Sequence, residues 1–304
     1  MRPGSIGGVT RLELGRVGIW GHLDTLPADE ARRYAKRVDE LGYAALWVPE
    51  TVGREPFSLL AMLAAQTSRL VLGTSIINIW GRDAQATRMG AMTLSEATAG
   101  RFVLGLGVSH PHLAGKLRGH HYERPLSRMR EYLAAYRAAI YTGPMSAGVP
   151  EPPVLLAALR ERMTDLAATE ADGAFPYLVT PERVAWMRER LDAARTDPRP
   201  ILAVSMPVAL GDRGPGLAAA RAYLAPYLRT PNYRASWELQ GFGPEDFEAP
   251  GSEGLVEAMV SVGTPAQARQ RIADLHDAGA DHVAILPLAA DGTTEHLPTV
   301  EALS

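Results

Sequence analysis

Residues 28–48 read ADEARRYAKRVDELGYAALWV and contain the structural unit from which the chain is built. Apolar residues at positions 28, 31, 35 and 38 recur at helical spacing, and charged residues fill the other positions, which predicts an amphipathic helix. Gly42 follows where a C-terminal cap belongs, and Ala44–Val48 is an apolar run typical of a buried strand. The stretch therefore predicts a helix, a tight turn and a buried strand in immediate succession.

The same succession returns at residues 163–175 and 272–286. A helix that leads through a short turn into an apolar strand is typical of α/β units with a parallel sheet. Helical patterns separate most of the strand candidates. Eight strands are predicted in all: Val17–Trp20, Ala44–Val48, Leu70–Ile77, Phe102–Leu106, Val154–Ala157, Ala174–Tyr177, Ile201–Ala209 and Val283–Pro287.

Eight units in a chain of 304 residues average 38 residues each, which fits a (β/α)₈ TIM barrel with insertions at its C-terminal face. An open, doubly wound sheet with a small second domain is the alternative. We expect one domain over residues 1–304, with the Gly-rich segment 1–13 as a flexible N-terminal extension. Residues 142–153 and 230–254 lack clear periodicity and are predicted to be surface excursions.

Composition excludes several classes of partner and site. The net charge is −3, from 31 basic and 34 acidic residues, so no basic surface for nucleic acid is expected. No run approaches the 18 apolar residues of a membrane span, and residues 1–10 lack the apolar stretch of a signal peptide. The absence of cysteine removes disulfides and thiolate metal sites. We expect a cytoplasmic protein with a small-molecule substrate, and a homodimer is left open.

In a TIM barrel the loops that leave the strands at the C-terminal face carry the active site. The segment Gly105–Pro111 follows the fourth predicted strand. Its glycines allow backbone N–H groups to approach an anion, and Ser109 adds a hydroxyl donor, so the loop is a candidate for holding a cofactor phosphate. A plain tight turn would account for the same residues.

Titratable side chains also fall in these loops. His22 and His110 are candidate proton donors, because a histidine titrates near neutrality, although either also fits a solvated loop position. Glu50, just after the second strand, is a site residue, a helix cap or a surface acid. No HExxH or comparable spacing is present, so no metal site is expected.

Three tryptophans, Trp20, Trp47 and Trp80, lie at predicted strand ends. Packing in the core or at the rim is the default for each, but three indoles around one mouth would also form an apolar wall for a flat ring system. We therefore include them, together with His22, in the predicted substrate pocket. The residues alone predict a barrel enzyme with an apolar mouth.

Several segments resemble one family. Residues 57–74, FSLLAMLAAQTSRLVLGT, and residues 100–110, GRFVLGLGVSH, are similar to the luciferase-like monooxygenase superfamily, especially the actinobacterial branch of coenzyme F420-dependent oxidoreductases. Residues 41–50 and 278–283 share the likeness, which extends over residues 15–287. The family fold is a TIM barrel, in agreement with the strand count.

The resemblance implies a place for the deazaflavin cofactor F420. Its ring would lie in the barrel mouth against a bulge formed by a cis peptide bond between Ser75 and Ile76. Its phosphate tail would pass the loop after the fourth strand and run toward the sixth. The implied cofactor-binding residues are Ser75, Ile76, Asn78, Gly107, Val108, Ser109, Pro176 and Tyr177.

The sequence departs from the family where dehydrogenases of this branch often carry an acid followed by histidine, because the pair here is Glu50 and Thr51. Threonine cannot act as an acid or base at neutral pH. The resemblance implies hydride transfer between F420 and a small organic substrate, with Glu50, His110 or water as the proton donor. An FMN-linked monooxygenase and a non-catalytic flavin-binding barrel are the alternatives.

Overall fold

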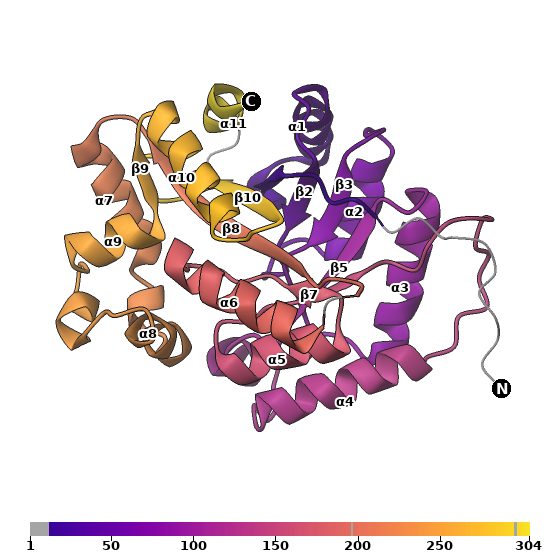
Figure 1. Cartoon of the computed structure of the whole chain (residues 1–304). Helices are drawn as coiled ribbons and strands as arrows, with labels where there is room; N and C mark the ends of the chain where they lie inside the picture. Colours follow the sequence, from indigo (N-terminus) through magenta and orange to yellow (C-terminus); the bar gives the residue numbers. More distant parts are fainter. Residues whose placement is uncertain (1–11, 196, 295–296) are drawn as a thin grey trace.

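A closed parallel barrel forms the centre of the computed structural model, which describes residues 12–195, 197–294 and 297–304 (Figure 1). The strands follow one another round the barrel in chain order, and β10 closes it by pairing with both β1 and β8. This closure confirms the predicted TIM barrel and excludes the open sheet. The barrel strands are β1 (Val17–Trp20), β2 (Ala45–Val48), β3 (Val71–Thr74), β5 (Phe102–Gly107), β6 (Val154–Leu156), β7 (Gly173–Ala174), β8 (Ile201–Leu210) and β10 (His282–Pro287).

Helices cover the outside of the barrel. Many begin with proline in the first turn, where the missing N–H costs no hydrogen bond, and Asp83 and Thr180 cap α3 and α6 with their side chains. None of the helices in the described residues is long and apolar enough to cross a membrane. The helices around the barrel are α1 (Ala28–Glu40), α2 (Pro56–Ala64), α3 (Ala84–Ala97), α4 (Pro125–Ala138), α5 (Glu161–Glu170), α6 (Pro181–Ala194), α10 (Pro265–Asp277) and the terminal α11 (Pro298–Leu303).

Residues 1–11 of the predicted N-terminal extension, 1–13, lie outside the described residues. The predicted third strand, 70–77, is divided into β3 and a short β4 (Ile77–Asn78), which pairs with β5. The division falls at the bond between Ser75 and Ile76, which is cis. The cis bond implied by the family resemblance is therefore confirmed.

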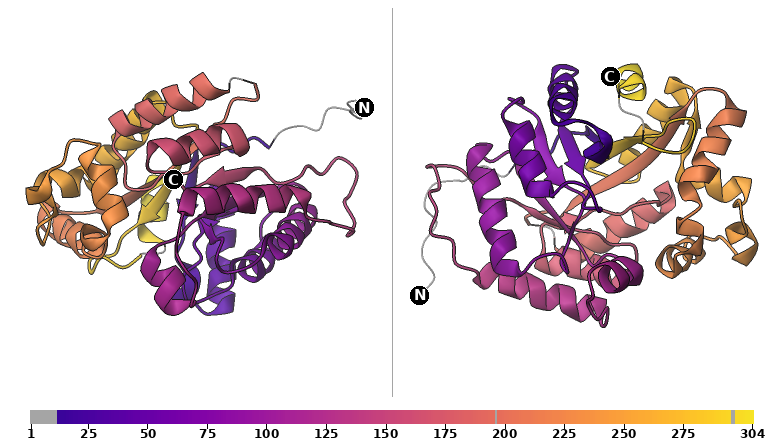
Figure 2. Two further views of the ribbon diagram at one scale, coloured as in Figure 1. Left: turned by 90° about the horizontal axis from the view of Figure 1, so that it is seen from below. Right: turned by 180° about the vertical axis from the view of Figure 1, so that it is seen from behind.

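The predicted surface excursion at residues 230–254 lies beside the barrel, but it contains regular helices that the sequence did not predict. The chain between β8 and β10 forms α7 (Arg213–Leu224), α8 (Pro231–Glu238), α9 (Glu253–Met259) and β9 (Ser261–Gly263), which extends the sheet along the end of β8. Figure 2 shows these helices grouped beside the barrel in both views. Trp237 is fully buried in their own hydrophobic cluster. Gly and Pro divide this segment into helices too short to display a period. Residues 142–153, in contrast, form no helix or strand, as predicted.

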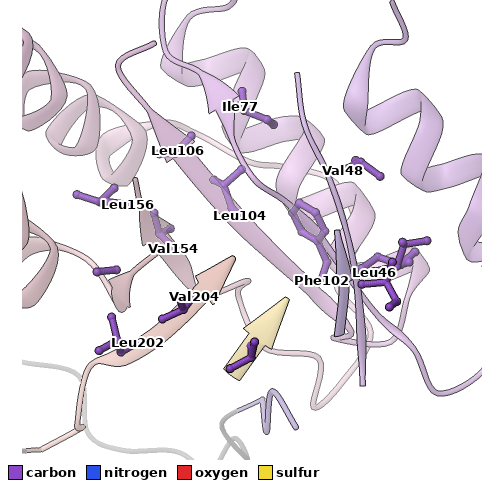
Figure 3. Packing of buried hydrophobic residues seen from close by; sticks show 14 of the residues in the cluster. Leu46, Val48, Ile77, Phe102, Leu104, Leu106, Val154, Leu156, Leu202 and Val204 are labelled. Atoms are coloured by element: carbon purple, nitrogen blue, oxygen red, sulfur yellow. The ribbon is translucent and has the colours of Figure 1, made fainter. Parts of the chain in front are cut away.

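Strand side chains alternate between the helices and the barrel interior. Figure 3 shows Phe102, Leu104 and Leu106 at alternate positions of β5, within the cluster that packs under the helices. The interior is filled by Trp47, whose ring packs edge-on against Phe175 at 4.7 Å between centroids. A Cβ on Gly73 would lie 2.3 Å from the Trp47 ring, so only glycine fits beside this indole.

Trp47 therefore does not line the mouth. The prediction made from its place at a strand end is wrong. Its side chain is fully buried, and its Nε1–H donates to Nε2 of His282, the first residue of β10, at 2.9 Å. The indole points toward the end of the barrel where the strands begin. It belongs to the packed interior and not to a substrate pocket.

Candidate functional site

The bend between β3 and β4 is packed against β5 through two glycines. A Cβ on Gly105 would lie 1.9 Å from the carbonyl oxygen of Thr74, and a Cβ on Gly107 would lie 2.5 Å from Cδ1 of Ile76. The sequence suggested that these glycines admit an anion. In the structure these glycines instead make room for the neighbouring strand and for the Ile76 side chain. The family resemblance assigns the bend at Ile76 to the cofactor ring.

The loop after β5 is held by side chains from two other segments. The Nε1–H of Trp80 donates to the carbonyl oxygen of Val108 at 2.9 Å. The hydroxyl of Tyr122 donates to the backbone carbonyl oxygen of Ser109 at 3.1 Å. Ser109 has a φ of +56°, and within the described chain its N–H donates to no acceptor. The loop can therefore present this amide to an anion, and its role in binding a phosphate stays a prediction.

Glu50 is buried and fully engaged. Its Oε2 accepts the backbone N–H of Asn78 at 2.6 Å, and its Oε1 forms ion pairs with Arg82 at 2.9 Å and Arg118 at 3.4 Å. Only 6% of its side chain is exposed. Because both oxygens accept hydrogen bonds from fixed donors, the geometry makes Glu50 a clamp between the end of β2 and β4. The predicted role as proton donor gains no support.

Asn78 and Trp80 take part in the same turn. The Oδ1 of Asn78 accepts the backbone N–H of Trp80 at 3.0 Å, and Asn78 is 4% exposed. Trp80 is partly exposed and its ring lies against those of His120 and Tyr122. Asn78 therefore acts within the protein, and Trp80 supports the loop after β5.

His22 has a carboxylate partner that sequence reasoning missed. Its Nε2 lies 3.4 Å from Oδ2 of Asp24, which also accepts the hydroxyl of Thr51, while Oδ1 of Asp24 accepts the N–H of Arg54 at 2.9 Å. Asp24 thus joins the loop after β1 to the loop after β2. The histidine that the family often places after strand two is absent, and His22 stands in contact with the same small network as Thr51.

His110 faces a cluster of tyrosines. Its ring centroid lies 5.5 Å from that of Tyr233, and the hydroxyls of Tyr177 and Tyr223 share a hydrogen bond. Burial raises the pKa of Tyr177, Tyr223 and Tyr233 well above 10, so all three are neutral phenols at physiological pH. Tyr177 follows β7, and its partners belong to α7 and α8. The sequence analysis assigned no role to the aromatic residues of these two helices.

Trp20 contacts the bend after β3, and Ser205 lies inside the barrel. The Nε1–H of Trp20 donates to the carbonyl oxygen of Ser75 at 3.1 Å, next to the cis bond. Ser205 lies two residues beyond Ala203 of the barrel interior, so both share the inner face of β8. Ser205 is 4% exposed, and its Oγ has no hydrogen-bond partner in the described residues. Pro176, also buried, accepts the Ser205 N–H at 3.3 Å through its carbonyl.

The chain is a closed (β/α)₈ barrel with titratable and aromatic side chains at the C-terminal ends of its strands, which is the arrangement of TIM-barrel enzymes. Sequence comparison identifies the family. The profile described as luciferase-like monooxygenase matches residues 12–282, and the chain belongs to this family. A Mycobacterium tuberculosis protein whose name assigns it, by inference, to the coenzyme F420-dependent oxidoreductases is 27% identical over 252 residues, which cover 70% of this chain and 71% of that protein.

Solved structures agree on the fold. The F420-dependent tetrahydromethanopterin reductase of Methanopyrus kandleri superposes with a TM-score of 0.71 at 17% identity, over 91% of this chain and 93% of that one. The FMN-bound oxygenating constituent of 3,6-diketocamphane monooxygenase from Pseudomonas putida gives 0.72 at 17% identity, over 95% of both chains. The protein is thus an oxidoreductase of the luciferase-like monooxygenase family, and the solved structures that share its fold include an F420-dependent and an FMN-bound enzyme.

Replacing Gly107 by valine is expected to displace Ile76 and weaken cofactor binding by about tenfold or more, since a Cβ at this position overlaps Cδ1 and Cγ1 of Ile76. The matched variant Gly107→Val/Ile76→Ala removes the overlap and should recover part of the affinity. Fluorescence titration with oxidised F420 measures both. Equal loss in the single and double variants would show that Gly107 serves the ligand directly and not the packing of Ile76.

Proposed function

We propose that the protein is an F420-dependent oxidoreductase that transfers hydride between the deazaflavin and a small organic substrate. Two observations inside and at the end of the barrel carry this proposal: Ile76 packs against Gly107 of β5 at the bend after β3, and the Ser205 hydroxyl on the inner face of β8 is buried without a partner in the described residues. The similarity to the mycobacterial F420-dependent relative favours the deazaflavin over FMN. We place the reaction in the cytoplasm, as the sequence predicts.

The residues of the mouth fit a flat heterocycle with a polar edge. Ser205 supplies a buried hydroxyl without a partner, a state that costs free energy unless a bound ligand satisfies it. Ile76 offers an apolar surface, and the Ser109 N–H would hold the phosphate of the tail. When bound, F420 supplies a hydride donor or acceptor at C5 of its ring.

The proton that accompanies hydride transfer to a carbonyl or imine must come from another group. His22 is the best placed candidate, because Asp24 orients its imidazole and the histidine lies in the loop that leaves β1 at the mouth. Glu50 is engaged with Asn78, Arg82 and Arg118, which leaves it a positioning role.

Equilibrium binding of oxidised F420 and of FMN tests the proposal. We expect F420 to bind at least about tenfold more tightly than FMN, a difference of about 1.4 kcal/mol. The reduced cofactor should then be oxidised by at least one member of a panel of carbonyl, imine and activated alkene substrates.

Two outcomes would contradict this proposal. Tighter binding of FMN, with oxygen consumption by the reduced complex, would make the protein a flavin monooxygenase. Tight binding of F420 without turnover of any compound in the panel would favour a non-catalytic binding barrel.

A further inference from the structure

Three arginines line one depression in the helical segment that follows β8. Arg221 belongs to α7, Arg229 ends the short 3₁₀ helix Tyr227–Arg229, and Arg234 belongs to α8. The depression beside them has a volume of about 480 Å³. Within the described residues none of the three forms an ion pair, and none of their terminal guanidinium nitrogens donates a hydrogen bond. The Nε of Arg221 is buried and also lacks an acceptor there. The depression therefore has several unused, positively charged donors.

The guanidinium of Arg234 is held in place on one side. Its Nε–H donates to the carbonyl oxygen of Leu228, and its central carbon lies 5.7 Å from the centroid of the Phe247 ring. An aromatic neighbour of this kind orients the guanidinium plane. Because both contacts leave the terminal nitrogens free, these can bind a carboxylate or phosphate oxygen.

The nearby carboxylates do not neutralise these arginines. Glu248 is the one carboxylate among the described residues that line the depression, so three arginines against one acid leave the lining a net charge of +2. The pKa of Glu253 is lowered mainly by Arg213, with which it pairs, and only to a smaller extent by Arg221. Asp246 accepts two hydrogen bonds within its own loop. The depression thus favours an anion.

The rest of the lining is apolar. Phe247 and Leu228 are 4% and 2% exposed and belong to the hydrophobic cluster of this segment. Tyr223, which joins the tyrosine cluster, lies on the other side of α7 from Arg221, so the depression and that cluster occupy opposite faces of the helix. The remaining apolar residues of the lining are small and exposed: Ala222, Ala225, Ala249 and Pro250.

We propose that this depression binds a small amphiphilic anion, that is, an apolar molecule with a carboxylate or phosphate head. The head forms charge-assisted hydrogen bonds with the free guanidinium donors. The apolar body covers the alanines and the edge of Phe247, which removes apolar surface from water. The site goes beyond the proposed function, because neither F420 nor a hydride acceptor takes part in it.

Calorimetric titration of the full chain with octyl phosphate and with octanoate tests the site. We expect saturable binding of both, and the tighter of the two identifies the preferred head group. Inorganic phosphate lacks the apolar body and octanol lacks the charge, so each should bind at least about tenfold more weakly than octyl phosphate. The titration needs no cofactor and no enzymatic substrate, so its outcome is independent of the proposed function.

Three variants and one control assign the binding to this depression. Arg221→Gln and Arg234→Gln should each weaken binding of octyl phosphate by about tenfold, because each removes charge-assisted donors. Glu248→Gln should tighten binding by about threefold, because it removes the negative charge from the lining. Arg33→Gln, whose arginine pairs with Asp29 on α1, removes the same charge elsewhere and should bind as the unaltered protein does.

Arg234→Gln also loses the contacts with Leu228 and Phe247, so Arg221→Gln and Glu248→Gln keep the test independent of its stability. Absence of saturable binding up to about 10 mM, well above a dissociation constant of about 1 mM, would overturn the proposal. Equal affinity for octyl phosphate in Arg221→Gln, Glu248→Gln and the unaltered protein would overturn it as well. Octanol bound as tightly as octyl phosphate would show that the arginines take no part, with the same consequence.

Discussion

The Glu50→Gln variant should lose about 3 kcal/mol in free energy of unfolding and bind F420 about tenfold more weakly. In the native protein the Glu50 carboxylate accepts the Asn78 N–H and pairs with Arg82, whose side chain is 14% exposed. Removing one partner of a buried ion pair leaves the other uncompensated, which costs about 3 to 5 kcal/mol. Arg82 keeps Glu55 at 3.0 Å, which places the expected loss at the lower end. Urea unfolding and fluorescence titration measure the two effects.

His22→Gln is the matched comparison. His22 is about one-third exposed and touches the network only through Asp24, which keeps Thr51 and the Arg54 N–H as partners. We expect its stability to change by less than about 1 kcal/mol and its F420 affinity to stay constant, while turnover of an identified substrate falls by about 100-fold. The reverse pattern, a stable Glu50→Gln variant that binds F420 normally but does not turn over, would restore Glu50 as the proton donor.

The barrel could be predicted from sequence because its signals are local. Residues 28–48 carry a helix, a cap and a strand within one stretch, and α1 and β2 form there within one residue of the prediction. The seat at Ser75 and Ile76 came from family resemblance. No local propensity indicates it, because β-branched residues such as Ile76 and Ile77 favour plain extended strand.

The side-chain network was harder to predict because it depends on register between segments. Trp47 lies directly opposite Gly73 in the pairing of β2 with β3. Because Gly73 has no side chain, it leaves room for the indole in the barrel interior. The position at a strand end gave no sign of this depth. His22, Asp24 and Thr51 come together only once β1 and β2 are adjacent.

The same limit applies to Glu50. Its position at a strand end is equally consistent with catalysis and with clamping. The partners that decide between them, Arg82 and Arg118, lie more than thirty residues away in segments without a recognisable motif.

Acidification from pH 7 to pH 4 should destabilise the protein by about 3 kcal/mol through His282 alone. This imidazole is fully buried, accepts the Nε1–H of Trp47, and has its Nδ1 2.7 Å from the carbonyl oxygen of Gly15. Burial lowers the pKa of His282 from 6.5 to about 4. The unfolded chain therefore binds a proton that the folded chain excludes. The stability due to the neutral ring is complete above pH 6.5 and is lost as the pH falls toward 4, by about 2 kcal/mol at pH 5.

The His282→Gln variant isolates this contribution, because glutamine does not titrate and can still accept from Trp47 and donate to Gly15. Urea unfolding of both proteins between pH 4 and pH 7.5 gives the difference directly. Carboxylates with a lowered pKa, such as Asp39, also make the protein less stable as the pH falls. Their effect is the same in both proteins and cancels in the comparison. We expect the two stability curves to lie closest together at pH 7.5 and to separate as the pH falls toward 4, because only the unaltered protein loses the contribution of about 3 kcal/mol from His282. Curves that run parallel across this range would mean that the folded protein admits the proton at His282, and that the interior around Trp47 is not closed to water.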